Sequence, residues 1–212
     1  MLLVLIRTLL IKESIMNLPN KITISRIILS IGLLVLLVFP FDLCEIEIPS
    51  YLVCGKINIS LLYIVAGVIF LIASITDFID GNIARKKGLV TDFGKVMDAI
   101  ADKVLVNGVL IALACNGLID TVIPVIIITR DIFVDSIKMV AGSNGHAVGA
   151  SILGKLKTIC MMTGLTLTFF ANIPFELVGV DVATGLLYVA TVLSIVSGIQ
   201  YYIVNKECFK EK

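Results

Sequence analysis

Six apolar stretches, each about as long as a membrane-crossing helix, constrain this chain more than any other feature of its sequence. A bilayer-spanning α-helix needs about 20 predominantly apolar residues. Stretches of that length lie at residues 22–41, 59–76, 94–115, 121–140, 156–173 and 185–204. Of the 212 residues, 58% are hydrophobic before the 16 glycines are counted, whereas soluble domains reach about 45–50% with glycine included. We therefore expect an all-α, polytopic membrane protein with six transmembrane helices.

The distribution of basic residues predicts how these helices are oriented. The loops at 42–58, 116–120 and 174–184 hold only one of the 17 Lys and Arg residues, Lys56, against six acidic residues. The other basic residues lie in the two termini, in the loops 77–93 and 141–155, and at the helix ends beside them. Because basic residues favour the cytoplasmic side, we expect an N-in/C-in, multi-pass protein of the cell membrane.

The first 15 residues do not fit this scheme. Residues 1–10 are apolar but too short to span a bilayer, and no small-residue cleavage site follows them. The segment that begins at Met16 reads as a natural start. We expect residues 1–15 to be an N-terminal extension, either upstream of the true start or a short interfacial segment, and residues 16–212 to form the membrane domain.

The scarcity of some residue types excludes several kinds of site. The only histidine, His146, rules out chemistry that needs two histidines in one chain. The five cysteines show no C-x-x-C spacing, which argues against a disulfide framework or a thiolate metal site. The near balance of 17 basic and 16 acidic residues gives no indication of a nucleic-acid partner.

Four aspartates form the most informative pattern in the chain. Asp77 and Asp80 are three residues apart, and Asp98 and Asp102 are four apart, so each pair shares one face of a helix. The pairs lie at the predicted cytoplasmic ends of two consecutive helices. If those faces meet, four carboxylates converge. Like charges at a membrane would drive protonation unless cations balance them. Oxygen ligands favour Mg²⁺ or Mn²⁺, and two such ions are common in displacement at phosphorus.

A different class of function, an Asp-lined divalent-cation transporter, stays open as an alternative. Transport sites tend to lie near the middle of the bilayer. Here Asp77 follows about 18 apolar residues and Asp98 begins the next helix, so the cluster belongs near the interface. The alternatives differ in outcome, because a transporter moves cations without releasing a product.

The aspartates belong to a longer motif that resembles a known signature. The pattern D-x2-D-G-x2-A-R-x8-G-x3-D-x3-D is similar to that of the CDP-alcohol phosphatidyltransferase family. Residues 17–26 and 153–158 resemble segments of the family branch that uses sn-glycerol 3-phosphate as acceptor, so the resemblance covers nearly all of residues 16–212. Two positions depart from it: Ala99 stands where proline is frequent, and Lys138 where arginine is frequent. The signature positions are filled by Asp77, Asp80, Gly81, Ala84, Arg85, Gly94, Asp98 and Asp102.

This resemblance implies transfer of a phosphatidyl group from CDP-diacylglycerol to sn-glycerol 3-phosphate, giving phosphatidylglycerophosphate and CMP in phospholipid biosynthesis. It implies that Asp77, Asp80 and Asp98 hold one metal ion, Mg²⁺ or Mn²⁺. Asp77, Asp98 and Asp102 would hold a second, and Asp102 would also act as general base. Rival acceptors, an inositol phosphate or serine, remain open because they share the aspartate motif. The family also implies a homodimer.

The remaining site residues are expected from the same resemblance. The nucleotide-lipid substrate would contact Asn20, Lys21, Ile22, Thr23, Gly81, Ala84, Arg85 and Thr91. An acceptor with a phosphate dianion needs a basic pocket, for which the candidates are Arg130, Lys138, Lys155 and Lys157. Asp131 and Asp135 lie beside Arg130 in the sequence, and one of them could orient it. Lys155 and Lys157 do not share a helix face, so we expect only one of them to reach the pocket.

Overall fold

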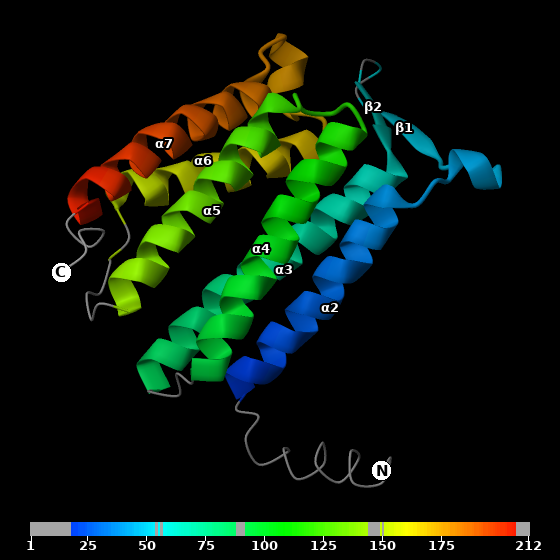
Figure 1. Cartoon of the computed structure of the whole chain (residues 1–212). Helices are drawn as coiled ribbons and strands as arrows, with labels where there is room; N and C mark the ends of the chain where they lie inside the picture. The colour runs from blue at the N-terminus through cyan, green and yellow to red at the C-terminus, as the bar shows by residue number, and fades with distance from the viewer. Residues whose placement is uncertain are drawn as a thin grey trace, which may run out of the picture. The chain divides into compact units, whose positions relative to one another are not determined.

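The computed structural model describes the backbone of residues 18–53, 55, 57–87, 92–143, 149 and 151–206, and the side chains of these residues except 18–21, 42, 78–87, 92, 93 and 95. The described part of the chain is mostly helical, as the sequence predicts. Its long helices are α2 (Leu18–Val38), α3 (Leu61–Lys87), α4 (Asp92–Cys115), α5 (Val122–Ser143), α6 (Ile152–Phe169) and α7 (Val182–Asn205) (Figure 1).

Each predicted apolar stretch coincides with one of these helices, but α3 is longer than expected. It continues past position 76 to Lys87, so most of the predicted loop 77–93 is helical. Residues 77–87 contain no proline, and they end in Arg85, Lys86 and Lys87, basic residues that favour the C-terminal end of a helix dipole. The aspartate motif therefore starts within α3 and ends within α4.

A β-hairpin lies where the sequence predicts only a loop. Strands β1 (Ser50–Val53) and β2 (Ile57–Ser60) pair antiparallel, with Ser50 opposite Ser60 and Val53 opposite Ile57. Ile57 and Ile59 are buried while Asn58 between them is exposed, which is the alternation of a half-buried strand. Each strand has only four residues, which is too short to be detected in a search for apolar stretches of helix length. The segment 42–58 was predicted only as a connection between two apolar stretches, and the strands within it were not predicted.

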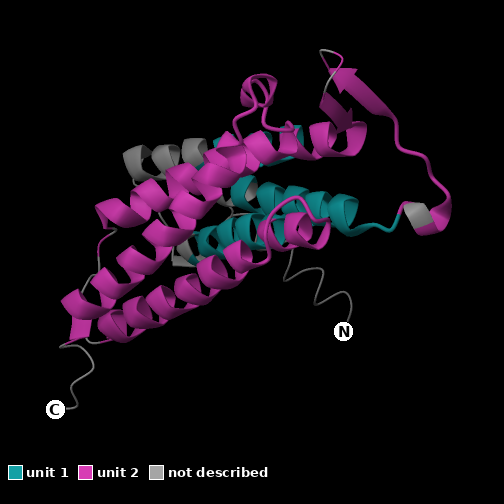
Figure 2. Ribbon diagram, turned by 90° about the horizontal axis from the view of Figure 1, so that it is seen from above, with its two compact units in different colours: residues 1–40, 68–109 teal, residues 41–67, 110–212 magenta. Residues whose placement is uncertain are grey.

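The chain divides into two compact units (Figure 2). Unit 1 comprises residues 1–40 and 68–109, and unit 2 comprises residues 41–67 and 110–212. In unit 1, buried apolar residues of α2, α3 and α4 form the core, among them Leu33, Phe70, Ala73 and Leu105. In unit 2, α7 packs against both α5 and α6 (Figure 1).

Helices α6 and α7 approach closely because a glycine lies at their contact. A Cβ added at Gly164 would lie 2.9 Å from Leu187 Cγ and 3.2 Å from the carbonyl oxygen of Ala183. Leu187 is fully buried, so it has no open space to move into. Small residues that allow close backbone approach are typical of helix pairs in membranes.

Two helices of the described residues, α6 and α7, are long and apolar enough to cross a membrane. Helices α4 and α5 carry too many charged residues to meet the same criterion; in α5 these are Arg130, Asp131, Asp135 and Lys138. Many large apolar side chains nevertheless lie on the outside of the helices, such as Ile28 at 67% exposure, Phe133 at 67% and Met139 at 74%. Apolar exposure on this scale marks a surface that contacts lipid or another protein.

Replacing Gly164 tests the contact between α6 and α7. The Gly164→Ala variant should lose about 1–3 kcal/mol of unfolding free energy, because the added methyl group overlaps Leu187 and backbone. Gly185→Ala in α7 is the matched control, since a Cβ there meets nothing within 4 Å. Thermal unfolding in detergent measures both variants. Equal melting temperatures for Gly164→Ala and the wild type would contradict the close contact.

Candidate active site

In unit 1, three helices bring an arginine and two of the signature aspartates together. Arg26 of α2 pairs through Nη1 with Asp77 of α3, and its Nη2 lies 3.3 Å from Asp98 Oδ1 of α4. Thr23, one turn before Arg26 on the same face of α2, donates a hydrogen bond of 2.6 Å to the same Asp98 oxygen. Carboxylates that are 21 positions apart in the sequence therefore meet at one guanidinium group.

The burial of these groups is unequal. The side chain of Arg26 is only 1% exposed, whereas those of Asp77 and Asp98 are 46% and 44% exposed. The guanidinium thus lies beneath the carboxylates, which are open to solvent or to a ligand. Burying a charge is costly unless it is paired, so the two aspartates stabilise Arg26 where it lies. The predicted convergence of the carboxylates is confirmed for this pair.

Of the other two aspartates of the motif, the structure describes the side chain of only one. Asp102 lies on α4, one turn beyond Asp98, and is exposed. The side chain of Asp80 lies outside the described residues. Within the described residues, no three metal-ligating side chains gather into one group.

The residues expected to contact the nucleotide are likewise incompletely described. Thr23 is 2% exposed and faces Asp98, and Ile22 is partly buried beside it. For the other residues predicted to contact the nucleotide, the structure describes only the backbone or nothing. The backbone alone is described for Asn20, Lys21, Gly81, Ala84 and Arg85, and Thr91 lies wholly outside the described residues.

Sequence reasoning missed Arg26. The prediction treated it as one of the basic residues that set topology, although it lies inside an apolar helix. A charged residue within a membrane helix is expensive and marks function by default, and its position three residues after Thr23 places both on one face. These two signals together could have identified it.

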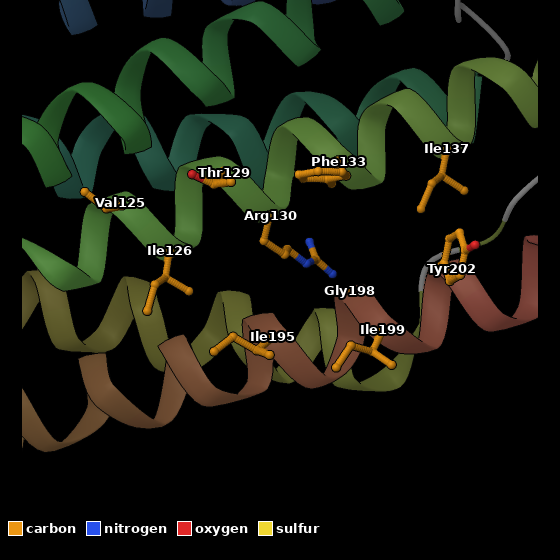
Figure 3. Close-up of a pocket in the computed structure, with 10 residues that line it drawn as sticks. All are labelled: Val125, Ile126, Thr129, Arg130, Phe133, Ile137, Ile195, Gly198, Ile199 and Tyr202. Atoms are coloured by element: carbon orange, nitrogen blue, oxygen red, sulfur yellow. The ribbon is translucent and has the colours of Figure 1, made fainter.

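In unit 2, all three guanidinium nitrogens of Arg130, on α5, donate hydrogen bonds. Nε donates to the carbonyl oxygen of Ser194 at 3.1 Å, Nη1 to Asp131 Oδ1 at 2.9 Å, and Nη2 to Ser197 Oγ at 2.7 Å. The guanidinium also lies over the ring of Tyr201, 5.6 Å from its centroid. The side chain extends from α5 towards α7 (Figure 3), and the prediction that a neighbouring aspartate orients it is confirmed.

The three other predicted phosphate-binding residues lie in different surroundings. Lys157 of α6 is 4% exposed, and its Nζ lies 3.0 and 2.9 Å from the two oxygens of Asp131. Lys138 is exposed and its Nζ lies 5.5 Å from the centroid of the Tyr201 ring. Lys155 is exposed whereas Lys157, two positions further on, is buried, so the two lysines point to different faces of α6.

Tyr201 links this basic cluster to the start of α6. Its hydroxyl accepts a hydrogen bond of 2.9 Å from the backbone N–H of Ser151 and donates one of 3.1 Å to the carbonyl oxygen of Gly149. Ser151 caps α6, because its hydroxyl accepts from the N–H of Gly154. The positive end of the α6 dipole therefore lies next to the cluster.

A groove of about 570 Å³ runs between α5 and α7 next to Arg130. Its other lining residues are apolar or weakly polar, among them Phe133, Ile195 and Tyr202 (Figure 3). Such a lining fits hydrocarbon rather than a phosphate group. Gly198 makes the approach of Arg130 to α7 possible, since a Cβ there would lie 3.0 Å from Arg130 Cγ.

Replacing Arg26 tests the three-helix contact of unit 1. The Arg26→Met variant should lose about 1–3 kcal/mol of unfolding free energy, because the ion pairs with both aspartates disappear. The Arg26→Lys variant keeps the charge but not the fork of donors, so its loss should be smaller. Thermal unfolding in detergent with a chelator measures both variants. A methionine variant as stable as the wild type would contradict the role assigned to Arg26.

Comparison with known proteins identifies the family. Residues 16–196 match the model of the CDP-alcohol phosphatidyltransferase family. A CDP-diacylglycerol–glycerol-3-phosphate 3-phosphatidyltransferase of Bacillus subtilis is 38% identical over 194 residues, which is 92% of this chain and 97% of the relative. The enzyme of the same name from Rickettsia bellii is 33% identical, over 91% of this chain and 97% of its own length.

Solved structures show the same fold. A phosphatidylinositol phosphate synthase of Mycobacterium tuberculosis in its apo form aligns with a TM-score of 0.57 at 18% identity, over 95% of this chain and 97% of that chain. A structure of that synthase in complex with manganese and citrate aligns with a TM-score of 0.56 at 20% identity, over 92% of this chain and 86% of that chain. By its sequence motif, by the family model and by these relatives, the chain belongs to the CDP-alcohol phosphatidyltransferase family.

Proposed function

We propose that this protein transfers the phosphatidyl group of CDP-diacylglycerol to sn-glycerol 3-phosphate, giving phosphatidylglycerophosphate and CMP. The convergence of Asp77 and Asp98 on one point, within a complete family signature, is the observation that carries the reaction type. The acceptor rests on the names of the relatives, which match this chain over more than nine-tenths of its length.

The donor set fits hard divalent cations. Every candidate ligand is a carboxylate oxygen, which suits Mg²⁺ or Mn²⁺, and the carboxylates of Asp77 and Asp98 already face a cationic group. In this proposal Asp77, Asp80 and Asp98 hold one ion, and Asp77, Asp98 and Asp102 hold a second. Ions held by these aspartates would supply the positive charge that neutralises the diphosphate and stabilises CMP as a leaving group.

The protein's own side chains then bind and orient the substrates. Asp102, which is exposed on α4, accepts the proton from the acceptor hydroxyl as that oxygen attacks phosphorus and CMP leaves. The nucleotide part contacts Gly81, Ala84, Arg85 and Thr91, and the stretch from Asn20 to Thr23 borders it. Because a metal-bound aspartate is a weak base, much of the rate must come from positioning.

The acceptor phosphate binds the basic cluster of unit 2 in this proposal. Three of the four predicted cations share neighbours there: Arg130 and Lys157 contact Asp131, and Arg130 and Lys138 contact the Tyr201 ring. Arginine suits bidentate binding of a phosphate, whereas lysine acts as a point charge. Lys155, on the exposed side of α6, serves as an outer attraction for the anion.

The proposal also places the protein in the cell membrane. Residues 16–212 form one membrane domain with six spans, N-in and C-in, behind an extension at residues 1–15. The active site faces the cytoplasm, and the molecule is a homodimer. Apolar side chains exposed along several helices, and the two helices that meet the length and apolarity criterion, support the membrane assignment.

Release of CMP by the purified protein in detergent tests the reaction. With CDP-diacylglycerol, Mg²⁺ and sn-glycerol 3-phosphate, CMP should form, and Asp102→Asn should lower kcat by at least about 100-fold, as loss of a general base does. Glu47→Gln, a change of the same kind at an exposed loop residue, is the control. Release only with an inositol phosphate or serine would overturn the acceptor. Cation flux without CMP release would favour the transporter.

Cysteine labelling tests the topology. Cys44 and Cys115 are exposed and lie in or beside predicted external loops. In single-cysteine variants, both should react with a membrane-impermeant maleimide in intact cells, whereas Cys208 near the C-terminus should react only after the cells are opened. Labelling of Cys208 in intact cells would contradict the C-in orientation.

A further inference from the structure

Asp131 lies between two cations of the basic cluster, the largely buried Arg130 and the buried Lys157. Its Oδ1 accepts from Arg130 Nη1 at 2.9 Å, and both of its oxygens lie within 3.0 Å of Lys157 Nζ. Arg130 lies on the same helix, whereas Lys157 comes from α6. One carboxylate therefore ties α5 to α6 and fixes the distance between two positive groups.

The contacts of Arg130 leave part of its guanidinium for a ligand. An arginine has five N–H donors. Within the described part of the chain, its hydrogen bonds use one donor on Nε, one on Nη1 and one on Nη2. These bonds leave one N–H on each terminal nitrogen, and the two terminal nitrogens belong to the fork of donors with which arginine binds phosphate. The first turn of α6 lies beside this fork, since a Cβ at Gly154 would be 3.9 Å from Nη2.

The pairing with Asp131 decides which way this fork points. A guanidinium is planar and rigid, so fixing Nε on Ser194, Nη1 on Asp131 and Nη2 on Ser197 sets its plane and its rotation. Asp131 is the only charged residue among these three acceptors, so it alone adds an ion pair to its hydrogen bond with the guanidinium. Without it, Arg130 and Lys157 would also repel each other at close range in a poorly solvated place.

We propose that Asp131 is a positioning residue, which holds Arg130 and Lys157 in the arrangement that binds the phosphate of the acceptor alcohol. The inference rests on the proposed function. It predicts the opposite change in anion binding to the one expected if only the net charge of the cluster mattered. Removing a negative charge beside two cations should strengthen the binding of an anion if charge alone matters. It should weaken that binding if Asp131 sets the geometry.

Steady-state kinetics of Asp131→Asn distinguish these readings. We expect the KM for sn-glycerol 3-phosphate to rise about tenfold or more, which corresponds to the loss of about 1.4 kcal/mol of binding. The KM for CDP-diacylglycerol should stay within about twofold, because that substrate does not use the cluster. Glu47→Gln is the matched control and should change neither constant. An unchanged or lower KM for the acceptor, or an equal rise for both substrates, would overturn the inference.

A second variant and a second measurement keep the test decisive. Asp131→Glu keeps the charge but moves the carboxylate by one methylene group, so it should fold and raise the acceptor KM by a smaller factor than Asp131→Asn. If Asp131→Asn does not fold, an unchanged acceptor KM in Asp131→Glu would overturn the inference. Stabilisation of the protein by inorganic phosphate in thermal unfolding needs no turnover. It should be present in the wild type and weaker in both variants, even if the wild type releases no CMP with this acceptor.

Discussion

The burial of arginine side chains among apolar helices is the constraint on which both units of this protein depend. A guanidinium cannot lose its charge at physiological pH, so it must be matched by acceptors wherever it is buried. In unit 1, Arg26 is matched by carboxylates from α3 and α4, and in unit 2, Arg130 is matched by Asp131 and by two serines of α7. In each unit, the arginine fixes which helices lie together and which of their faces meet.

Glycines let the helices come near enough for these pairs to form. In unit 1, Leu34 of α2 lies so close to α4 that a Cβ at Gly108 would be 2.5 Å from Leu34 Cδ1. In unit 2, Gly198 leaves space for the stem of Arg130, and Gly164 lets α6 approach α7. Because these glycines lie within helices, their value comes from the missing side chain and outweighs the roughly 1 kcal/mol that glycine costs a helix.

The sequence predicts the helices well because long apolar stretches have few alternatives. It predicts less well where a short pattern or a distant partner decides the outcome. The extension of α3 through Lys87 and the hairpin at β1 and β2 were not expected, since both lie between apolar stretches. The motif correctly predicts that Asp77 and Asp98 converge. It could not show that Arg26 lies between them, or that Lys157 pairs with Asp131, because those contacts join residues 72 and 26 positions apart.

The pairing of Arg26 has a consequence for biogenesis. The chain is made from its N-terminus, so α2 emerges before the helices that carry Asp77 and Asp98. Until they follow, Arg26 is a charge in the N-terminal half of an apolar helix, where a charge is costly unless it is matched. In the proposed six-span arrangement, α2 is therefore a weak membrane segment alone, and it is stabilised only when α3 and α4 arrive. The same arrangement makes insertion of this part of the protein a cooperative event of three helices.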